Sequence, residues 1–177
     1  TRSYGTPVVF NSGSSNWIAC TYDSNADKTL ISFNSSSTGK AIVGSVSGSA
    51  ISFGSAATFE SASSEHIDSC FDSTNNKVVI AYQDNADSSK GKAVVATISG
   101  TSVSFGSVAQ FEAGATTVIS CEHDSTNGKV LIAYCDESNS FYGTAIVGTV
   151  SSTSISFGSA TVFYSGDMRS VRTDMAF

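Results

Sequence analysis

The stretch "ISFGSAATFESASSEHIDSCFDSTNNKVVIAYQDNADSSKGKAVVATISG", residues 51–100, decides the fold because most of the chain repeats it. Phe53, Phe105 and Phe157 follow one another at intervals of 52 residues (105 − 53 and 157 − 105). The same interval separates the members of three further sets, Gly54/Gly106/Gly158, Phe59/Phe111/Phe163 and Gly39/Gly91/Gly143. A constant period near fifty residues is typical of propellers, solenoids and other arrays of one supersecondary unit.

The repeat divides the 177 residues into three full units and two fragments. We predict a partial repeat over residues 1–15, full repeats over 16–60, 61–112 and 113–164, and a second partial repeat over 165–177. The first fragment would supply the last strand of a preceding unit, and the second would supply the first strand of a following unit. Because both ends fall inside the repeated pattern, we expect the rest of a longer chain, or further copies of this one, to complete the array.

Four short runs in each unit alternate with turn signals, as in residues 66–72, 77–84, 91–100 and 51–59. The first run alternates with a period of two, which is typical of a strand with one buried face. The second and third runs are apolar on both faces, so they must be covered on both sides. Between the first two runs lie segments rich in Asp, Asn and Gly, such as Asn127-Gly128, which favour tight hairpins.

These patterns predict an all-β fold of tandem four-stranded antiparallel repeats of about 52 residues, packed face to face like β-propeller blades. Another stacked or paired β-array and a β-sandwich remain as alternatives. Three units and two fragments fall short of the four blades that the smallest propellers contain. We therefore expect partner units from other copies or from a longer chain.

Composition limits the function classes. The formal charge of −6 and the low charged fraction of 14% disfavour a nucleic-acid partner, which requires clustered Lys and Arg. The sequence contains no apolar run of about eighteen residues, the length that a membrane-spanning helix needs, and no signal peptide is visible. Cys20, Cys70, Cys121 and Cys135 lack the spacing of a metal site. We interpret them as small buried hydrophobes and keep a structural disulfide as an alternative.

Three phrases carry a resemblance to a known family. They are "SYGTPVVFNSGSSNWIACTYDSN" (residues 3–25), "DSTNNKVVIAYQD" (residues 72–84) and "GTAIVGTVSSTSISFGSATVF" (residues 143–163). In this order they resemble the repeats of tail-fibre and other virion structural proteins of marine tailed bacteriophages. The resemblance covers essentially the whole chain and implies a virion or extracellular-surface component. Two departures are the turn between Phe33 and Gly39, three residues shorter than its counterpart between Tyr82 and Gly91, and the divergent segment 167–177.

Candidate ligand-binding residues lie where the copies differ most. An aromatic residue at the entry to the first run could stack on a sugar ring, and the acidic loops after the second run could contact a ligand or a cation. The candidates are Trp17, His66, Asp84, Asn85, Asp87, Asp136, Glu137 and Asn139. The alternatives are a strand-end packing role for the two ring residues and ordinary solvated loops for the acidic residues.

Other constellations favour no catalytic or metal site. The segment 23–27, "DSNAD", begins like a calcium loop but has Lys28 where such a loop needs glycine, so we interpret it as a hairpin turn. Cys121 and His123 are two residues apart, but His123 occupies the position of Tyr22 and Phe71 and is expected to pack as a flat ring. The carboxylates recur by repetition and do not converge as a glycosidase pair requires.

We therefore predict a non-enzymatic structural or adhesive repeat module of a viral tail fibre or similar surface appendage, in contact with cell-surface glycans and without a metal or cofactor. A stand-alone propeller lectin and a glycan-cleaving enzyme are the alternatives.

Overall fold

The structure, a computed structural model, describes residues 4–169 and contains strands and two single 3₁₀ turns. The elements are β1 (Asn16–Asp23), β2 (Lys28–Ser35), β3 (Thr38–Ser47), β4 (Ala50–Phe53), β5 (Ala57–Glu60), β6 (Ser64–Asp72), β7 (Lys77–Asp84), η1 (Asn85–Asp87), β8 (Lys90–Ser99), β9 (Ser102–Phe105), β10 (Ala109–Asp124), β11 (Lys129–Asp136), η2 (Glu137–Asn139), β12 (Tyr142–Ser151), β13 (Ser154–Phe157) and β14 (Thr161–Tyr164). Every strand pair is antiparallel, which confirms the predicted all-β antiparallel class. Most of the predicted final fragment, from residue 170 on, lies outside the described residues.

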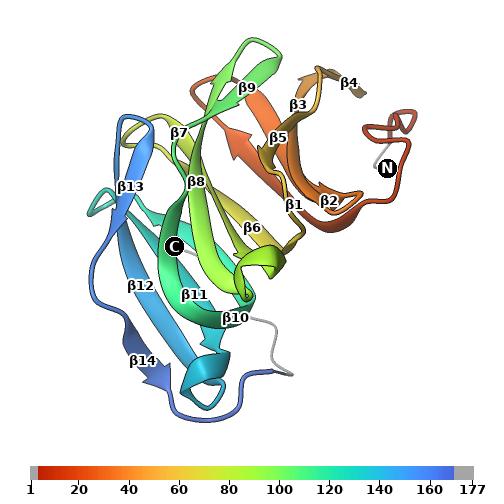
Figure 1. The fold of residues 1–177 in the computed structure, drawn as a ribbon. Coiled ribbons are helices and arrows are strands. Elements are labelled where there is room, and N and C mark those ends of the chain that lie inside the picture. The colour runs from red at the N-terminus through yellow and green to blue at the C-terminus, as the bar shows by residue number, and fades with distance from the viewer. Residues whose placement is uncertain (1–3, 170–177) are drawn as a thin grey trace.

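The strands pair in three groups, which we call the first, second and third sheet units. In the first unit β1 pairs with β2 and β2 with β3, while β4 and β5 share the far edge of β3. The second unit orders β6, β7, β8 and then β9 with residues 109–115 of β10 in the same way. The third orders residues 116–124 of β10, β11, β12 and then β13 with β14. Figure 1 shows the three units side by side, from the first (red and orange) to the third (blue).

Asparagine and aspartate side chains shape the hairpins between the first two strands of each unit. Asp72 accepts hydrogen bonds from the backbone N–H groups of Thr74 and Asn75 at 2.9 and 3.1 Å. Asp23 and Asp124 accept equivalent bonds in the other two units. Segment 23–27 is thus a hairpin turn, as predicted, because its first carboxylate binds the turn's own backbone.

Two boundaries differ from the expected pattern. The run 51–59 is predicted to form one strand, but β4 and β5 are separate. The pairing with β3 ends with the N–H of Gly54, which donates to the carbonyl of Val43 at 2.9 Å, and resumes at Ala57 one residue out of register. The predicted boundary between residues 112 and 113 falls inside β10. This strand leaves the edge of β8 and becomes the first strand of the third unit without a turn.

The core consists of apolar layers between successive units. Val78, Ile80 and Tyr82 of β7 pack toward the first unit, and Val79 and Ala81 of the same strand pack toward the third. All five side chains are fully buried. The two faces of the second unit are therefore covered by its two neighbours, as the apolar character of both faces required.

A recurring set of contacts joins each unit to the next. The ring of Phe59 in the first unit packs against Tyr82 of the second at a centroid distance of 5.1 Å, and the Tyr82 hydroxyl donates to Glu60 at 3.1 Å. Burial and the nearby Glu60 carboxylate raise the pKa of Tyr82. The corresponding set in the next interface is Phe111, Tyr134 and Glu112.

Glycine is required where the end of the fourth strand of one unit meets the hairpin between the third and fourth strands of the next. A Cβ atom at Gly54 would collide with the carbonyl oxygen of Thr101, and one at Gly106 would collide with that of Thr153. At the corresponding Gly158 of the third unit, an added Cβ would meet, of the described part of the chain, only the carbonyl oxygen of Val147, at an ordinary 3.8 Å.

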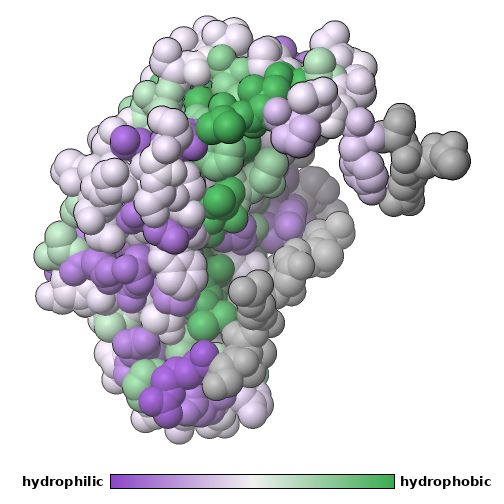
Figure 2. Space-filling view, turned by 90° about the vertical axis from the view of Figure 1, so that its right-hand side faces the viewer, coloured by the Kyte–Doolittle hydropathy of each residue, from purple (hydrophilic) through white to green (hydrophobic). Residues whose placement is uncertain are grey.

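The outward face of the third unit is less covered than its counterparts. Val147 is 46% exposed and Phe163 is 55% exposed, whereas the corresponding Val95 and Phe111 are buried. On the other side of the molecule, Figure 2 shows hydrophobic residues gathered in a band over the side that carries the first unit. Among residues 4–169, no helix has the length and apolar character needed to cross a bilayer.

Candidate functional site

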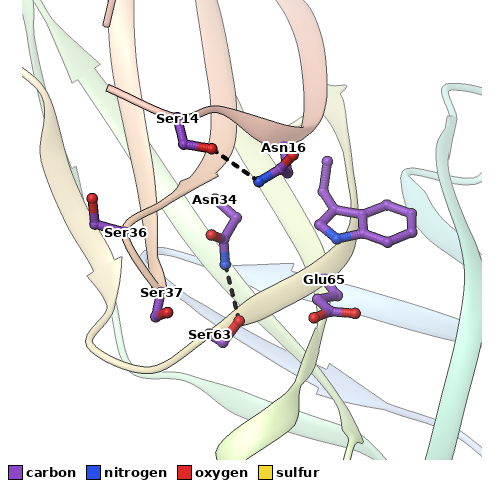
Figure 3. Close-up of a pocket in the computed structure, with 8 residues that line it drawn as sticks. Ser14, Asn16, Asn34, Ser36, Ser37, Ser63 and Glu65 are labelled. Carbon is purple, nitrogen blue, oxygen red and sulfur yellow. Dashed lines mark hydrogen bonds between the residues drawn. The ribbon is translucent and has the colours of Figure 1, made fainter. Parts of the chain in front are cut away.

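A polar pocket lies where the beginning of β1, the turn between β2 and β3, and the beginning of β6 meet. It has a volume of about 310 Å³, near the lower end of the range for small-molecule sites. Its lining is one indole, one carboxylate and six neutral polar side chains: Trp17, Glu65, Ser14, Asn16, Asn34, Ser36, Ser37 and Ser63. Figure 3 shows the polar side chains reaching the pocket from both the first and the second unit.

A β-bulge at the start of the first strand determines the backbone at Trp17. The pairing of β1 with β2 shifts register between Asn16 and Ala19, and Trp17 has a positive φ of 51°. His66 and Val118 have φ values of 47° and 52° in the equivalent bulges of β6 and β10. Bulges bend a strand and change the direction of a side chain, and a positive φ is uncommon for Trp and Val.

His66 packs against Trp17, so the two ring residues predicted as candidates lie together. Their ring centroids are 4.2 Å apart, and Trp17 remains 42% exposed. The Nδ1 atom of His66 accepts a hydrogen bond from the N–H of Val118 at 3.2 Å, so Nε2 carries the proton of the neutral ring. Desolvation lowers the pKa of His66, and the carboxylates of Glu65 and Glu137 oppose that shift.

Asn34 forms the polar link between the two units at the pocket. Its amide group donates to the carbonyl of Ser64 at 2.9 Å and to the hydroxyl of Ser63 at 3.2 Å. Asn16 donates to Ser14 at 3.4 Å on the opposite wall (Figure 3). Asn34 is buried, so these bonds hold its orientation before any ligand arrives.

The short turn between β2 and β3 helps to leave this space open. It is a two-residue turn in which Ser36 and Ser37 both have positive φ, 52° and 59°. In the second unit the equivalent connection is three residues longer and contains η1, where Asn85 donates to Glu65 at 2.5 Å. Glu65 is the repeat counterpart of Asn16, so the inserted turn occupies the place that is open in the first unit.

The acidic loop residues predicted as ligand contacts have structural partners. Asp84 accepts from the N–H of Ala86 at 3.0 Å and pairs with Lys92 at 2.6 Å. Asp136 accepts from the N–H of Asn139 at 3.1 Å and from the hydroxyl of Ser138 at 2.6 Å. Both carboxylates are buried and cap a 3₁₀ turn.

The remaining loop candidates are more accessible. Asp87 pairs with Lys90 and Lys92 at 2.9 Å each, and hydrogen bonds from Lys90 and then Lys92 lower its pKa. Asn85 and Asn139 are exposed, and Glu137 lies close enough to His66 to influence its pKa. None of these loop residues lines the Trp17 pocket, and a ligand role for them stays a prediction.

Cys121 and His123 each have another partner. The sulfur of Cys121 contacts Cys70, whereas Nε2 of His123 lies 3.0 Å from Asp72. Cys70, Cys121 and Cys135 are buried as expected, but Cys20 is exposed, because within residues 4–169 no strand lies against it in the way that β6 lies against Cys121. Within residues 4–169, no group of three or more His, Cys, Asp or Glu side chains is placed to hold a metal ion.

The pocket is chemically suited to a neutral polyhydroxylated ligand. Asn and Ser side chains offer both donors and acceptors, as a ring of hydroxyl groups requires, and an indole face can cover the apolar C–H face of a sugar. Glu65 is the one carboxylate among the lining residues, whereas hydrolysis of a glycosidic bond ordinarily uses two.

Comparisons of the chain with protein-family models, with curated proteins and with solved structures gave no match.

Proposed function

We propose that the chain is a non-enzymatic structural and adhesive repeat module that binds a glycan in the pocket of Trp17. The observation that carries this proposal is an exposed indole beside neutral amide and hydroxyl groups in a cavity of about 310 Å³. The binding groups come from two sheet units, and the hydrogen bonds of Asn34 hold those units in register. Binding therefore depends on the stacking of the sheets and not on a flexible loop.

The stacking itself supports a propeller-like arrangement of blades. The first strands of successive units are neighbours: Thr21 of β1 donates to the carbonyl of Ser69 in β6 at 2.6 Å, and Asp68 of β6 accepts from the N–H of Cys121 in β10 at 2.7 Å. Four-stranded sheets whose first strands lie together and whose broad faces pack on one another are the building units of a propeller.

A further unit of the same kind is the proposed partner for the outward face of the third unit. Leu131 and Val147 line an apolar groove of about 360 Å³ there. Phe163 is exposed on the same unit, and within residues 4–169 Gly158 lacks the hairpin contact that Gly106 has. In the two interfaces of this chain, another sheet unit of the same kind covers the equivalent surface. A further copy of such a sheet unit is therefore the proposed partner for the outward face of the third unit.

A location on a virion or another extracellular surface is part of the proposal. It is supported by the resemblance of segments 3–25, 72–84 and 143–163 to virion repeat proteins of tailed bacteriophages. Repeated weak contacts along such an appendage would add up to firm attachment through avidity.

Binding to arrayed bacterial surface glycans tests the site. The wild-type chain is expected to bind, and Trp17→Ala is expected to weaken binding at least about fivefold, since an aromatic stacking partner contributes roughly 1 kcal/mol or more. Tyr22→Ala is the matched control because Tyr22 is an exposed aromatic of the same strand that does not line the pocket.

Two results would contradict the proposal. Binding that is unchanged in Trp17→Ala but lost in Asp87→Asn would move the site to the acidic loops. Release of cleaved products from any arrayed polysaccharide would replace the non-enzymatic function with a hydrolytic one.

A further inference from the structure

Two cysteines from different sheet units meet in the core. Cys70 of β6 and Cys121 of β10 place their sulfur atoms 3.0 Å apart, and each side chain is 4% exposed. The hydrogen bond from the N–H of Cys121 to the Asp68 carboxylate fixes the two strands side by side at this point. The two thiols are thus held together without being linked.

The corresponding contact in the preceding interface is a pair of hydroxyl groups. Thr21 holds the repeat position of Cys70, Ser69 holds that of Cys121, and their oxygen atoms lie 2.6 Å apart. A hydroxyl pair therefore satisfies the packing requirement at this contact. The thiol pair adds one property that hydroxyl groups lack, which is the ability to form a covalent bond to each other.

We propose that Cys70 and Cys121 form a disulfide that fastens the second sheet unit to the third. With a small-molecule disulfide such as oxidised glutathione as oxidant, one protein thiolate attacks it and releases one glutathione thiolate. The second protein thiolate then attacks the mixed disulfide and releases the other. Two protein thiols lose two protons and two electrons, and one oxidised glutathione becomes two reduced molecules.

The burial of the pair controls when this reaction can occur. The hydrogen bond that Cys121 shares with Cys70, followed by desolvation, raises the pKa of Cys121, so the reactive thiolate is scarce in the folded protein. The disulfide therefore forms during folding or when β6 and β10 separate briefly. Once formed, it closes a loop between residues 70 and 121 and so lowers the conformational entropy of the unfolded chain. This stabilises the folded state, in which the second and third units are packed together. This inference does not depend on glycan binding.

Refolding of the full chain in a mixture of oxidised and reduced glutathione tests the proposal. Remaining thiols are alkylated under denaturing conditions, and tryptic peptides are separated without reduction. Cleavage after Lys28, Lys40, Lys77, Lys92 and Lys129 places the four cysteines in four different peptides. The expected result is a linked pair of the Cys70 and Cys121 peptides, a loss of two hydrogen atoms in mass, and alkylation of Cys20 and Cys135 alone.

A double variant that copies the other interface is the control. Cys70→Thr with Cys121→Ser recreates the hydroxyl pair and is expected to unfold at the same urea concentration under oxidising and reducing conditions. The parent chain is expected to unfold at higher urea when oxidised. Alkylation of all four cysteines after oxidative refolding, or preferential linkage of Cys70 to Cys20 or Cys135, would overturn the proposal, and the parent chain decides this even if the variant folds poorly.

Discussion

At the scale of single residues, positive φ angles mark the place where the sheet units can differ in function. Trp17, His66 and Val118 hold the same bulge position in three first strands, yet one is an exposed indole, one a packed imidazole and one an aliphatic side chain. The backbone is conserved between the units while the side chain changes. This combination allows one unit to carry a binding site without altering the stacking of the others.

His66 gives the fold a dependence on pH. Burial lowers its pKa below the ordinary 6.5, so the unfolded chain binds more protons than the folded chain as the pH falls below about 6.5. The free energy of unfolding should therefore fall as pH falls through this range, and the loss should stop below the folded-state pKa. Protonation of Nδ1 would also end its bond to the N–H of Val118.

Urea unfolding of the parent and of His66→Asn between pH 7.5 and pH 5 measures this effect. Asn does not titrate and tolerates positive φ, so the stability difference between the two proteins isolates the imidazole. We expect the parent to lose its advantage over the variant on acidification. A difference that stays constant with pH, or that grows in favour of the parent, would contradict the assigned burial of the ring.

Much of the candidate site could not be read from the sequence. Trp17 was recognisable as an aromatic residue at a variable position, but Asn34, Ser36 and Ser63 look like any of the Ser and Asn residues that fill the surface. The one available signal was the turn after Phe33, which is three residues shorter than its counterpart. The pocket results from this shorter turn only because the longer turn of the second unit fills the equivalent space. The sequence does not show which space a turn fills.

At the scale of elements, the sequence predicted strands well where burial determined their pattern. The predicted run 77–84 coincides with β7, and its repeat equivalent, residues 129–136, coincides with β11, because both faces of these strands must be apolar. The run 51–59 was predicted less well, since its pairing with β3 shifts by one residue between Gly54 and Ala57 and the alternation of side chains does not encode that shift. The caps formed by Asp84 and Asp136 have the composition of ligand loops, so sequence could not separate the two roles.

The glycine that follows the recurrent phenylalanine tests the junction between units. Gly106→Ala should lower the free energy of unfolding by about 1–3 kcal/mol, because the new methyl group must push back the carbonyl of Thr153. Gly158→Ala is the matched control and should change it by less than about 0.5 kcal/mol, since no hairpin of the described residues 4–169 contacts that position. Chemical denaturation measures both, and equal effects would show that the hairpin contact does not matter.

At the scale of the whole molecule, stability comes from apolar layers that each belong to two sheet units. The second unit has neighbours on both sides, whereas the outward face of the third leaves Val147 46% exposed. A chain built in this way is strongest in its middle. The outward face of the third unit carries exposed apolar side chains, Val147 and Phe163, at positions that are buried between the other units.

Equivalent positions on these two faces provide the most direct measurement. Val95 is fully buried between the second and third units, and Val147 is its counterpart on the outward face. Valine and threonine have nearly the same shape, so each Val→Thr change adds a hydroxyl group with little change in volume. The free energy of unfolding should fall by about 1–3 kcal/mol in Val95→Thr, and by less than about 0.5 kcal/mol in Val147→Thr. Equal losses at the two positions, or a larger loss at Val147, would contradict an architecture held together by faces buried between neighbouring sheets.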